Sequence, residues 1–205
     1  METIRMDKED IRFAASLLME GSVVAFPTDT VYGLGVIYGD LEALNALKKA
    51  KGRPDSKPIP LMIESVDQLR EVAYMTLEAK KLADAFMPGA LTLVLKKKKQ
   101  VSNEFTNGRD TIAVRMSDDP FVQSLIHCCG HPLLVSSANR SGEASAMSAE
   151  QVLEQLDGAI DAVVMGKASG TQASTIVDVS SDKIRILRSG AIREDDIWRV
   201  LKEEV

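Results

Sequence analysis

A chain of 205 residues with 45% hydrophobic and 27% charged residues has the composition of a globular protein able to build one substantial core. Its formal net charge of −5 argues against a surface built throughout to bind nucleic acid, because such domains are usually strongly basic. No run approaches the roughly 18 apolar residues that a membrane helix needs, and the charged N-terminus lacks the apolar core of a signal peptide. We therefore expect a cytoplasmic protein without a membrane partner.

The cysteines and histidines do not predict a metal site. Cys128 and Cys129 are the two cysteines of the chain, and adjacent residues have poor geometry for a mutual disulfide. His127 stands beside them, but consecutive residues lack the separated pairs of a zinc site. Two buried, reduced thiols at an apolar helix end are the expectation.

Apolar periodicity and capping residues predict the order of the elements. Helices are predicted at 7–21, at 40–52, after Ser65, at 77–86, after Pro120, after Ser148 and at 194–202. Strands are predicted at 22–26, 59–63, 91–95, 111–116, 132–135, 162–165, 175–179 and 183–187. Strands and helices alternate at first and strands cluster later, which favours one α/β domain with a mixed sheet over residues 1–205.

The segment 26–35 is the first candidate for a site. Pro27 ends the strand 22–26 by removing a backbone donor, and hydroxyl and carboxylate side chains, including Thr30, follow at once. Gly33 and Gly35 permit backbone angles and close approaches that a side chain would block. In open α/β sheets such strand ends hold ligands, but an ordinary polar turn explains this segment equally well.

Lys51, Arg53 and Lys57 form a short cationic cluster shaped by intervening glycine and proline. The planar fork of Arg suits phosphate oxygens and Lys acts as a mobile point charge, so the cluster fits a phosphate site. A solvated helix end is the alternative, since cations there also favour the helix dipole. The sequence contains neither a P-loop nor a Rossmann glycine fingerprint.

Further polar residues interrupt or follow apolar strands. The segment 136–139 offers short donors and acceptors that fit either a ligand edge or a helix cap. Arg115 lies inside the strand 111–116, where it needs a carboxylate or phosphate partner, and an internal acid serves as well as a ligand. Arg188 at the end of the strand 183–187 has the same two explanations. Lys96–Lys99 fit a solvated strand end or an RNA contact.

Residue types that many enzymes require are missing from the motifs. His127 and His131 lie in one short segment without the company of a catalytic triad, and no cluster of acids suggests a two-metal hydrolase. A site made of these residues would work by positioning and charge neutralisation, as phosphoryl and nucleotidyl transfer do.

Five segments together resemble the YrdC family, in the same order and across nearly the whole chain. They are 26–35, 51–54, 137–142, 174–178 and 187–190. The resemblance implies a single YrdC-like α/β domain, in which a twisted mixed sheet with flanking helices has a basic concave face. It also implies L-threonylcarbamoyladenylate synthase activity, which condenses L-threonine, bicarbonate and ATP to threonylcarbamoyl-AMP and pyrophosphate for the t6A modification of tRNA.

The resemblance also implies roles for individual residues. The threonine-binding positions are Thr30, Arg115 and Ser174. The ATP-binding positions are Lys51, Arg53, Lys57, Thr111, Ser137, Asn139, Ser145 and Arg188, with Lys51 and Arg53 also assigned to catalysis. ATP is expected with magnesium, and the expected partners are tRNA threonylcarbamoyl-transfer proteins, with a weak contact to tRNA itself.

Two points stay open within the resemblance. Met62 stands where longer relatives carry a histidine near the amino-acid pocket, and those relatives have a second domain, so the short single-domain form is expected here. An RNA-binding module of the same fold, or a nucleotide-binding relative acting on another amino acid, would use many of the same residues.

Overall fold

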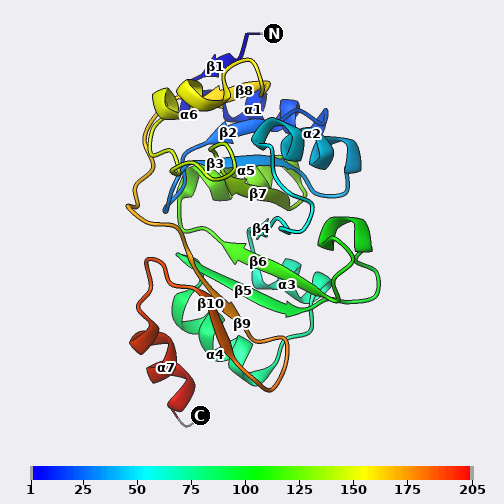
Figure 1. The fold of residues 1–205 in the computed structure, drawn as a ribbon, viewed down its shortest axis with the longest axis vertical. Coiled ribbons are helices and arrows are strands. Elements are labelled where there is room, and N and C mark those ends of the chain that lie inside the picture. The colour runs from blue at the N-terminus through cyan, green and yellow to red at the C-terminus, as the bar shows by residue number, and fades with distance from the viewer. Residues whose placement is uncertain (1, 204–205) are drawn as a thin grey trace.

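One mixed sheet of ten strands runs through the part of the chain that the computed structural model describes, residues 2–203 (Figure 1). Its strand order is β1-β8-β2-β3-β7-β4-β6-β5-β9-β10. The strands are β1 (Ile4–Met6), β2 (Val24–Phe26), β3 (Gly33–Ile37), β4 (Leu61–Ile63), β5 (Leu91–Lys96), β6 (Thr111–Met116), β7 (Leu133–Ser137), β8 (Ala162–Val164), β9 (Thr175–Asp178) and β10 (Arg185–Arg188). Parallel pairs such as β4–β6 and antiparallel pairs such as β5–β6 occur in the same sheet, so the prediction of a mixed sheet is confirmed.

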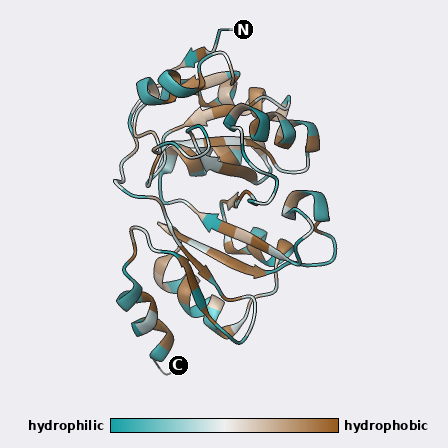
Figure 2. Cartoon of the chain, in the orientation of Figure 1, coloured by the Kyte–Doolittle hydropathy of each residue, from teal (hydrophilic) through white to brown (hydrophobic). Residues whose placement is uncertain are grey.

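Helices cover both faces of this sheet. The helices are α1 (Ile11–Met19), α2 (Leu41–Lys51), α3 (Val66–Val72), α4 (Leu77–Phe86), α5 (Pro120–Cys129), α6 (Ala149–Leu156) and α7 (Glu194–Lys202), with short 3-10 turns η1 (Lys8–Asp10) and η2 (Asn103–Thr106). Apolar residues of α1 and α5 pack in one core cluster, whereas α2, α3, α4, α6 and α7 contribute to the other. Their apolar stripes face the strands and their polar sides face outward (Figure 2).

Side-chain alternation along the strands divides the core between the two faces. Val24 and Phe26 of β2 pack with α1 and α5, while Ala25 between them packs in the other cluster. Successive residues of a strand point to opposite faces, so one short strand serves both layers. The strand is therefore buried on both sides and reads as a continuous apolar run.

Capping residues set the helix ends as the sequence indicates. The side chains of Asp40, Ser65 and Ser148 each accept a bond from the third residue of the helix that follows. Gly52 ends α2 and Gly130 ends α5 in the left-handed conformation, which glycine adopts without strain.

Two sequence-based predictions are wrong, and one strand was not predicted. Gly33–Ile37 is the strand β3, between β2 and β7, so the turn after β2 ends before Gly33. The prediction failed because glycine has a low strand propensity. Glycine is nevertheless needed here, because a Cβ on Gly35 would lie 2.7 Å from the ring of Phe26. The strand Ile4–Met6 was not predicted, because three residues carry no detectable period. Cys129 is buried as expected, but Cys128 is exposed on the outer side of α5.

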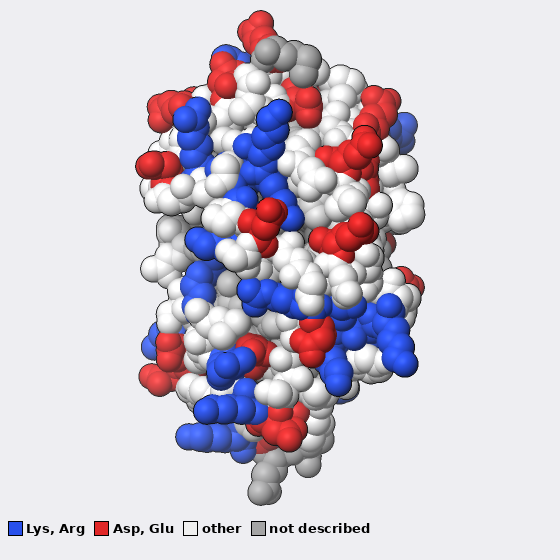
Figure 3. Space-filling view, turned by 45° about the vertical axis from the view of Figure 1, so that its right-hand side comes forward, with Lys and Arg blue, Asp and Glu red and all other residues white. Residues whose placement is uncertain are grey.

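Charge is mixed over the surface. On the face drawn in Figure 3, Lys and Arg gather in a band across the middle, with Asp and Glu interspersed among them. Among the described residues, no helix combines the length and apolar character needed to cross a membrane.

Candidate functional site

A cavity of about 380 Å³ opens on the sheet face that α1 and α5 cover in part. Thr111, Ala113 and Arg115, every second residue of β6, line it, while the residues between them pack in the core on the opposite face. Met62 and Val135 belong both to the cavity wall and to the core beneath α1 and α5, so this is the same face of the sheet. The cavity therefore occupies the part of the sheet that these helices leave uncovered.

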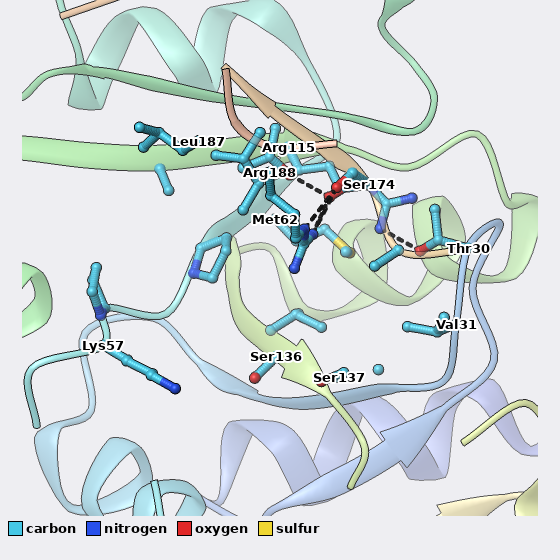
Figure 4. Close-up of a pocket in the computed structure, with 18 of the residues that line it drawn as sticks. Thr30, Val31, Lys57, Met62, Arg115, Ser136, Ser137, Ser174, Leu187 and Arg188 are labelled. Carbon is cyan, nitrogen blue, oxygen red and sulfur yellow. Dashed lines mark hydrogen bonds between the residues drawn. The ribbon is translucent and has the colours of Figure 1, made fainter. Parts of the chain in front are cut away.

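The lining brings together segments that are far apart in sequence (Figure 4). In the close-up, Thr30 and Lys57 stand on opposite sides, with Ser136 and Ser137 below. The polar and charged lining residues are Thr28, Thr30, Tyr32, Arg53, Ser56, Lys57, Thr92, Arg109, Thr111, Arg115, Ser136, Ser137, Ser145, Ser174 and Arg188. The sequence-predicted site residues are thus all brought to one cavity except Lys51 and Asn139.

The charge of the lining is one-sided. Arg53, Lys57, Arg109, Arg115 and Arg188 line the cavity, and no Asp or Glu of the described chain does so. Partial burial and then the neighbouring cation Arg188 lower the pKa of Arg53, and burial followed by Arg115 lowers that of Arg188. These cations repel one another in a chain whose net charge is −5, and an anionic ligand would relieve that repulsion.

One end of the cavity is built around Arg115. Its Nη2 donates to Asp29 Oδ1 at 2.5 Å, its Nη1 to Thr30 Oγ1 at 2.8 Å and its Nε to the carbonyl oxygen of Gly89 at 3.2 Å. Burial lowers the pKa of Arg115 and the carboxylate of Asp29 opposes that effect. Ser117 also donates to Asp29 Oδ1. Arg115 thus has the internal acid that one of its two explanations required.

Ser174 lies at the same end. Its Oγ is 2.7 Å from Thr92 Oγ1 and accepts from Arg188 Nη2 at 3.0 Å. Arg188 Nη2 also donates to the carbonyl oxygen of Ser174 at 2.7 Å, and within residues 2–203 no carboxylate lies within 4 Å of its guanidinium. Arg188 is therefore fixed by neutral groups, and its positive charge is not neutralised by an ion pair.

The other end of the cavity is built around Arg53 and the segment after it. Arg53 Nε donates to the carbonyl oxygen of Lys57 at 3.0 Å, and Nη2 to that of Pro58 at 2.8 Å. Its Nη1 donates to Ser136 Oγ at 3.2 Å, which ties the segment 53–58 to the end of β7. Arg53 is half-buried and bonded, so the alternative of a solvated helix-end side chain is wrong for this residue.

Lys51 and Asn139 stand behind the wall of the cavity. Lys51 is 3% exposed, and its Nζ donates to the carbonyl oxygens of Ser137 and, at 2.6 Å, of Asn139. Burial, and then the cation Arg53, lower the pKa of Lys51 to about 7. Asn139 Nδ2 donates to the carbonyl oxygens of Arg140 and Glu143. In this structure both side chains shape the backbone of the 137–139 segment.

Several lining residues were not predicted as site residues. Side-chain alternation along β5 could have identified Thr92. Thr92 and Val94 alternate with three leucines, so they point to the opposite face of the sheet, where the cavity lies. Arg109 and Ser56 lie in irregular segments, where no period exists to read. Ser136 was noted in its segment but not assigned.

The remaining candidates lie elsewhere. Within the described chain, none of Lys96–Lys99 lines the cavity, and Lys97 Nζ donates to the carbonyl oxygen of Val101 at 2.6 Å. His127 Nδ1 lies 3.4 Å from Glu64 Oε2 at an exposed site.

A mixed α/β sheet whose open face carries a cationic cavity, lined by no Asp or Glu of the described residues, is the architecture of a protein suited to small anionic ligands. Residues 16–190 match the family model Sua5_yciO_yrdC, described as "Telomere recombination". The chain belongs to this family.

Relatives of known name agree with the family. The chain is 41% identical over 191 residues to threonylcarbamoyl-AMP synthase of Bacillus subtilis (strain 168), covering 92% of this chain and 55% of the relative. It is 39% identical over 202 residues to threonylcarbamoyl-AMP synthase of Pyrococcus abyssi (strain GE5 / Orsay), covering 97% of this chain and 59% of the relative. The chain thus spans less than three-fifths of the length of either protein.

A solved structure confirms the fold. The crystal structure of P. abyssi Sua5 complexed with L-threonine superposes with a TM-score of 0.92 at 37% identity, covering 99% of this chain and 62% of that one.

Proposed function

We propose that the chain is an L-threonylcarbamoyladenylate synthase, which joins L-threonine, bicarbonate and ATP into threonylcarbamoyl-AMP with release of pyrophosphate. The observation that carries the proposal is the cavity wall, with five cations and no acid among its described residues. All three substrates carry carboxylate, carbonate or phosphate oxygens, and such a wall favours anions over neutral ligands. The relatives named threonylcarbamoyl-AMP synthase support this choice of anions.

L-Threonine is assigned to the end that contains Thr30, Arg115 and Ser174. Arg115 uses three of its five N–H donors on Asp29, Thr30 and Gly89 within the described chain, which leaves two for a substrate carboxylate. The hydroxyls of Thr30 and Ser174 are held at 2.8 Å and 3.0 Å by arginines, so their positions are fixed before any substrate enters. Preorganised polar groups of this kind bind an amino acid without a further ordering cost.

ATP is assigned to the end that contains Arg53 and Lys57. Ser136, Ser137 and Thr111 add short hydroxyls to the wall beside these cations. Lys51 and Asn139 are proposed to act on ATP by holding the 137–139 backbone, while Ser145 and Arg188 complete the wall.

The chemistry needs charge neutralisation more than a base. Bicarbonate yields carbon dioxide and hydroxide, and the amine of threonine adds to the carbon dioxide and gives its proton to the hydroxide, so a carbamate and water form. An oxygen of the carbamate then attacks the α-phosphorus of ATP. The bond from that phosphorus to the bridging oxygen of the β-phosphate breaks, and pyrophosphate leaves with the electron pair. Arg53 and Lys57 stabilise the negative charge that grows on the leaving group.

Magnesium would enter with ATP. The cavity wall offers no carboxylate, and no group of three His, Cys, Asp or Glu side chains suited to a metal occurs among residues 2–203. The side chains present do not fit a protein-held magnesium, whose ligands are oxygens of carboxylates, phosphates and water.

Other expectations from the sequence remain proposals of the same account. These are a cytoplasmic location, a single domain over residues 1–205, a basic concave face around the cavity, transfer proteins that consume the product for t6A formation, and a weak contact with tRNA.

Pyrophosphate release tests the proposal. It should require ATP, bicarbonate and L-threonine together, and L-serine or L-valine should replace L-threonine poorly. Equal release with any amino acid, or with none, would overturn the assignment of the substrate.

A further inference from the structure

Arg109 is a cavity-lining cation to which nothing above assigns a role. It follows Asn107 and Gly108, which both have positive φ angles of 52° and 75°, so the chain turns sharply before it. The backbone of Arg109 is fixed on both sides by buried Thr106, whose carbonyl accepts from Arg109 N at 3.1 Å and whose hydroxyl donates to Arg109 O at 2.8 Å. The side chain therefore starts from a rigid turn.

The guanidinium of Arg109 reaches the segment that carries Lys57. Its Nη2 donates to the carbonyl oxygen of Ser56 at 2.9 Å, across 53 positions of sequence. A second link joins the same two segments, because Lys48 Nζ lies 3.2 Å from Asp55 Oδ1 and 3.1 Å from Asn107 Oδ1. The segment 55–58 is thus held by bonds to residues 107–109, directly and through Lys48, as well as by the side chain of Arg53.

The charge of Arg109 is not used by the chain itself. Within residues 2–203 no carboxylate lies within 4 Å of its guanidinium nitrogens, and its one described side-chain bond is to the carbonyl oxygen of Ser56. Arg115, by contrast, is neutralised by Asp29. Four of the five N–H donors of Arg109 remain for a ligand or water at the Lys57 end of the cavity.

We propose that Arg109 is a further binding residue for the outer phosphates of the nucleotide. The inference rests on the function proposed above and extends it, because Arg53 donates to the carbonyl oxygens of Lys57 and Pro58 while Arg109 donates to that of Ser56, so both arginines meet the segment that carries Lys57. A triphosphate that lies along this segment meets three cavity-lining cations, Arg53, Lys57 and Arg109. AMP, which lacks the outer phosphates, does not reach Arg109.

The test is ATP binding to the full chain by calorimetry, without threonine, for wild type and Arg109→Gln. Glutamine removes the charge, and because it is shorter than arginine it also gives up the bond to Ser56, so the effect on positioning is measured separately below. ATP binding is expected to weaken by about fivefold to tenfold, while AMP binding stays unchanged. The loss of affinity is at the low end for a charge-assisted hydrogen bond because Arg109 is exposed to solvent. Inorganic tripolyphosphate should lose affinity in the same proportion. Arg12→Gln is the matched control, an exposed arginine of α1 outside the cavity wall, and should change none of these affinities.

A double-mutant cycle with Lys57→Gln separates direct binding from positioning of Lys57. If Arg109 touches phosphate, the two losses add in the double variant. If Arg109→Gln has no further effect once Lys57 is glutamine, the residue only positions the segment, and the proposal is overturned. If the wild type binds ATP and Arg109→Gln binds it equally well, this proposal alone is overturned. If the wild type does not bind ATP at all, the proposed function is overturned together with this proposal.

Discussion

Arg115 and Asp29 form the most buried ion pair of the described chain, with the guanidinium Nη2 and the carboxylate Oδ1 2.5 Å apart and both side chains less than a tenth exposed. The pair joins β6 to the turn after β2, and the same guanidinium donates to Thr30. One side chain thus anchors the turn and faces the cavity. On the proposed function, a structural role and a substrate role would coincide in this residue.

Arg115→Lys should lower both the stability of the protein and its affinity for L-threonine. Lysine keeps the charge and loses the fork, so the free energy of unfolding should fall by about 1–3 kcal/mol. L-threonine affinity should fall by roughly tenfold or more, while ATP affinity without threonine stays near that of wild type. Thermal melting and calorimetric titration measure both. Arg185→Lys, in the Arg185–Asp178 pair outside the cavity, is the control and should leave threonine affinity unchanged. Lower stability with unchanged threonine affinity would contradict the substrate role.

Arg53→Ala should act mainly on turnover. The change removes a cation from the end of the cavity that is assigned to ATP in the proposal, together with three hydrogen bonds that hold the segment 53–58 and Ser136. Loss of one preorganised donor typically costs about 2–4 kcal/mol of barrier, or about 30- to 1,000-fold in rate. Pyrophosphate release measures the effect. Arg70→Ala, in an exposed pair with Asp67, is the control and should keep full activity. Near-normal turnover by Arg53→Ala would place the phosphates elsewhere.

Lys51 should give the stability of the protein a pH dependence. Its folded pKa of about 7 lies below the ordinary value of 10.5, so between these values the unfolded state binds more protons and the unfolding free energy rises with pH. The slope from this group approaches about 1.4 kcal/mol per pH unit. Burial, and then Cys128, raise the pKa of Cys129 from 9.0 to about 11, so above pH 9.0 the folded state holds a proton that the unfolded state loses, and this opposes the trend. The effect of Lys51 is therefore measured between its folded pKa of about 7 and pH 9.0.

Denaturant unfolding of wild type and Lys51→Met over that window measures the difference. The variant should show a flatter rise of stability with pH, because methionine fills the buried space without a titrating group. Parallel curves for the two proteins would mean that Lys51 stays protonated in the folded state across the window.

Gly170→Ala should disturb the threonine end from behind. A Cβ on Gly170 would lie 2.4 Å from the carbonyl oxygen of Asp29 and 2.6 Å from Thr30 Cα, so the backbone of the turn must move. Overpacking of this kind costs about 1–3 kcal/mol, and displacement of Thr30 should weaken threonine binding. Gly39→Ala is the control, because it strains a backbone angle with φ of 103° but meets no atom within 4 Å. It should lower stability and leave threonine affinity intact; the same pattern in Gly170→Ala would refute the prediction.

Local signals explain why much of the fold was predictable. Asp40, Ser148 and the strand Thr111–Met116 follow rules that operate within a few residues, and the structure confirms them. A place in the cavity wall was predictable for candidate residues that follow a strand end or lie within a strand. Thr30 and Arg115 are examples.

Non-local relationships explain what was missed. Asp29 and Arg115 are 86 positions apart, and their pairing depends on the order of strands in the sheet, which no local pattern fixes. The strand β3 needs glycine at Gly33, because Val135 and Thr28 occupy the space where a side chain would be. Arg109 reaches the cavity through a turn in an irregular segment, and a sequence pattern gives no direction for such a side chain.

The most direct test of the account follows the carbon of labelled bicarbonate. The chain, given ATP, L-threonine and labelled bicarbonate, should form a labelled adenylate of threonine carbamate and release pyrophosphate in equal amount, and omission of any one substrate should abolish the label. Conversion of ATP to ADP and phosphate, or tight binding of ATP and threonine with no label in any nucleotide product, would contradict the proposed function.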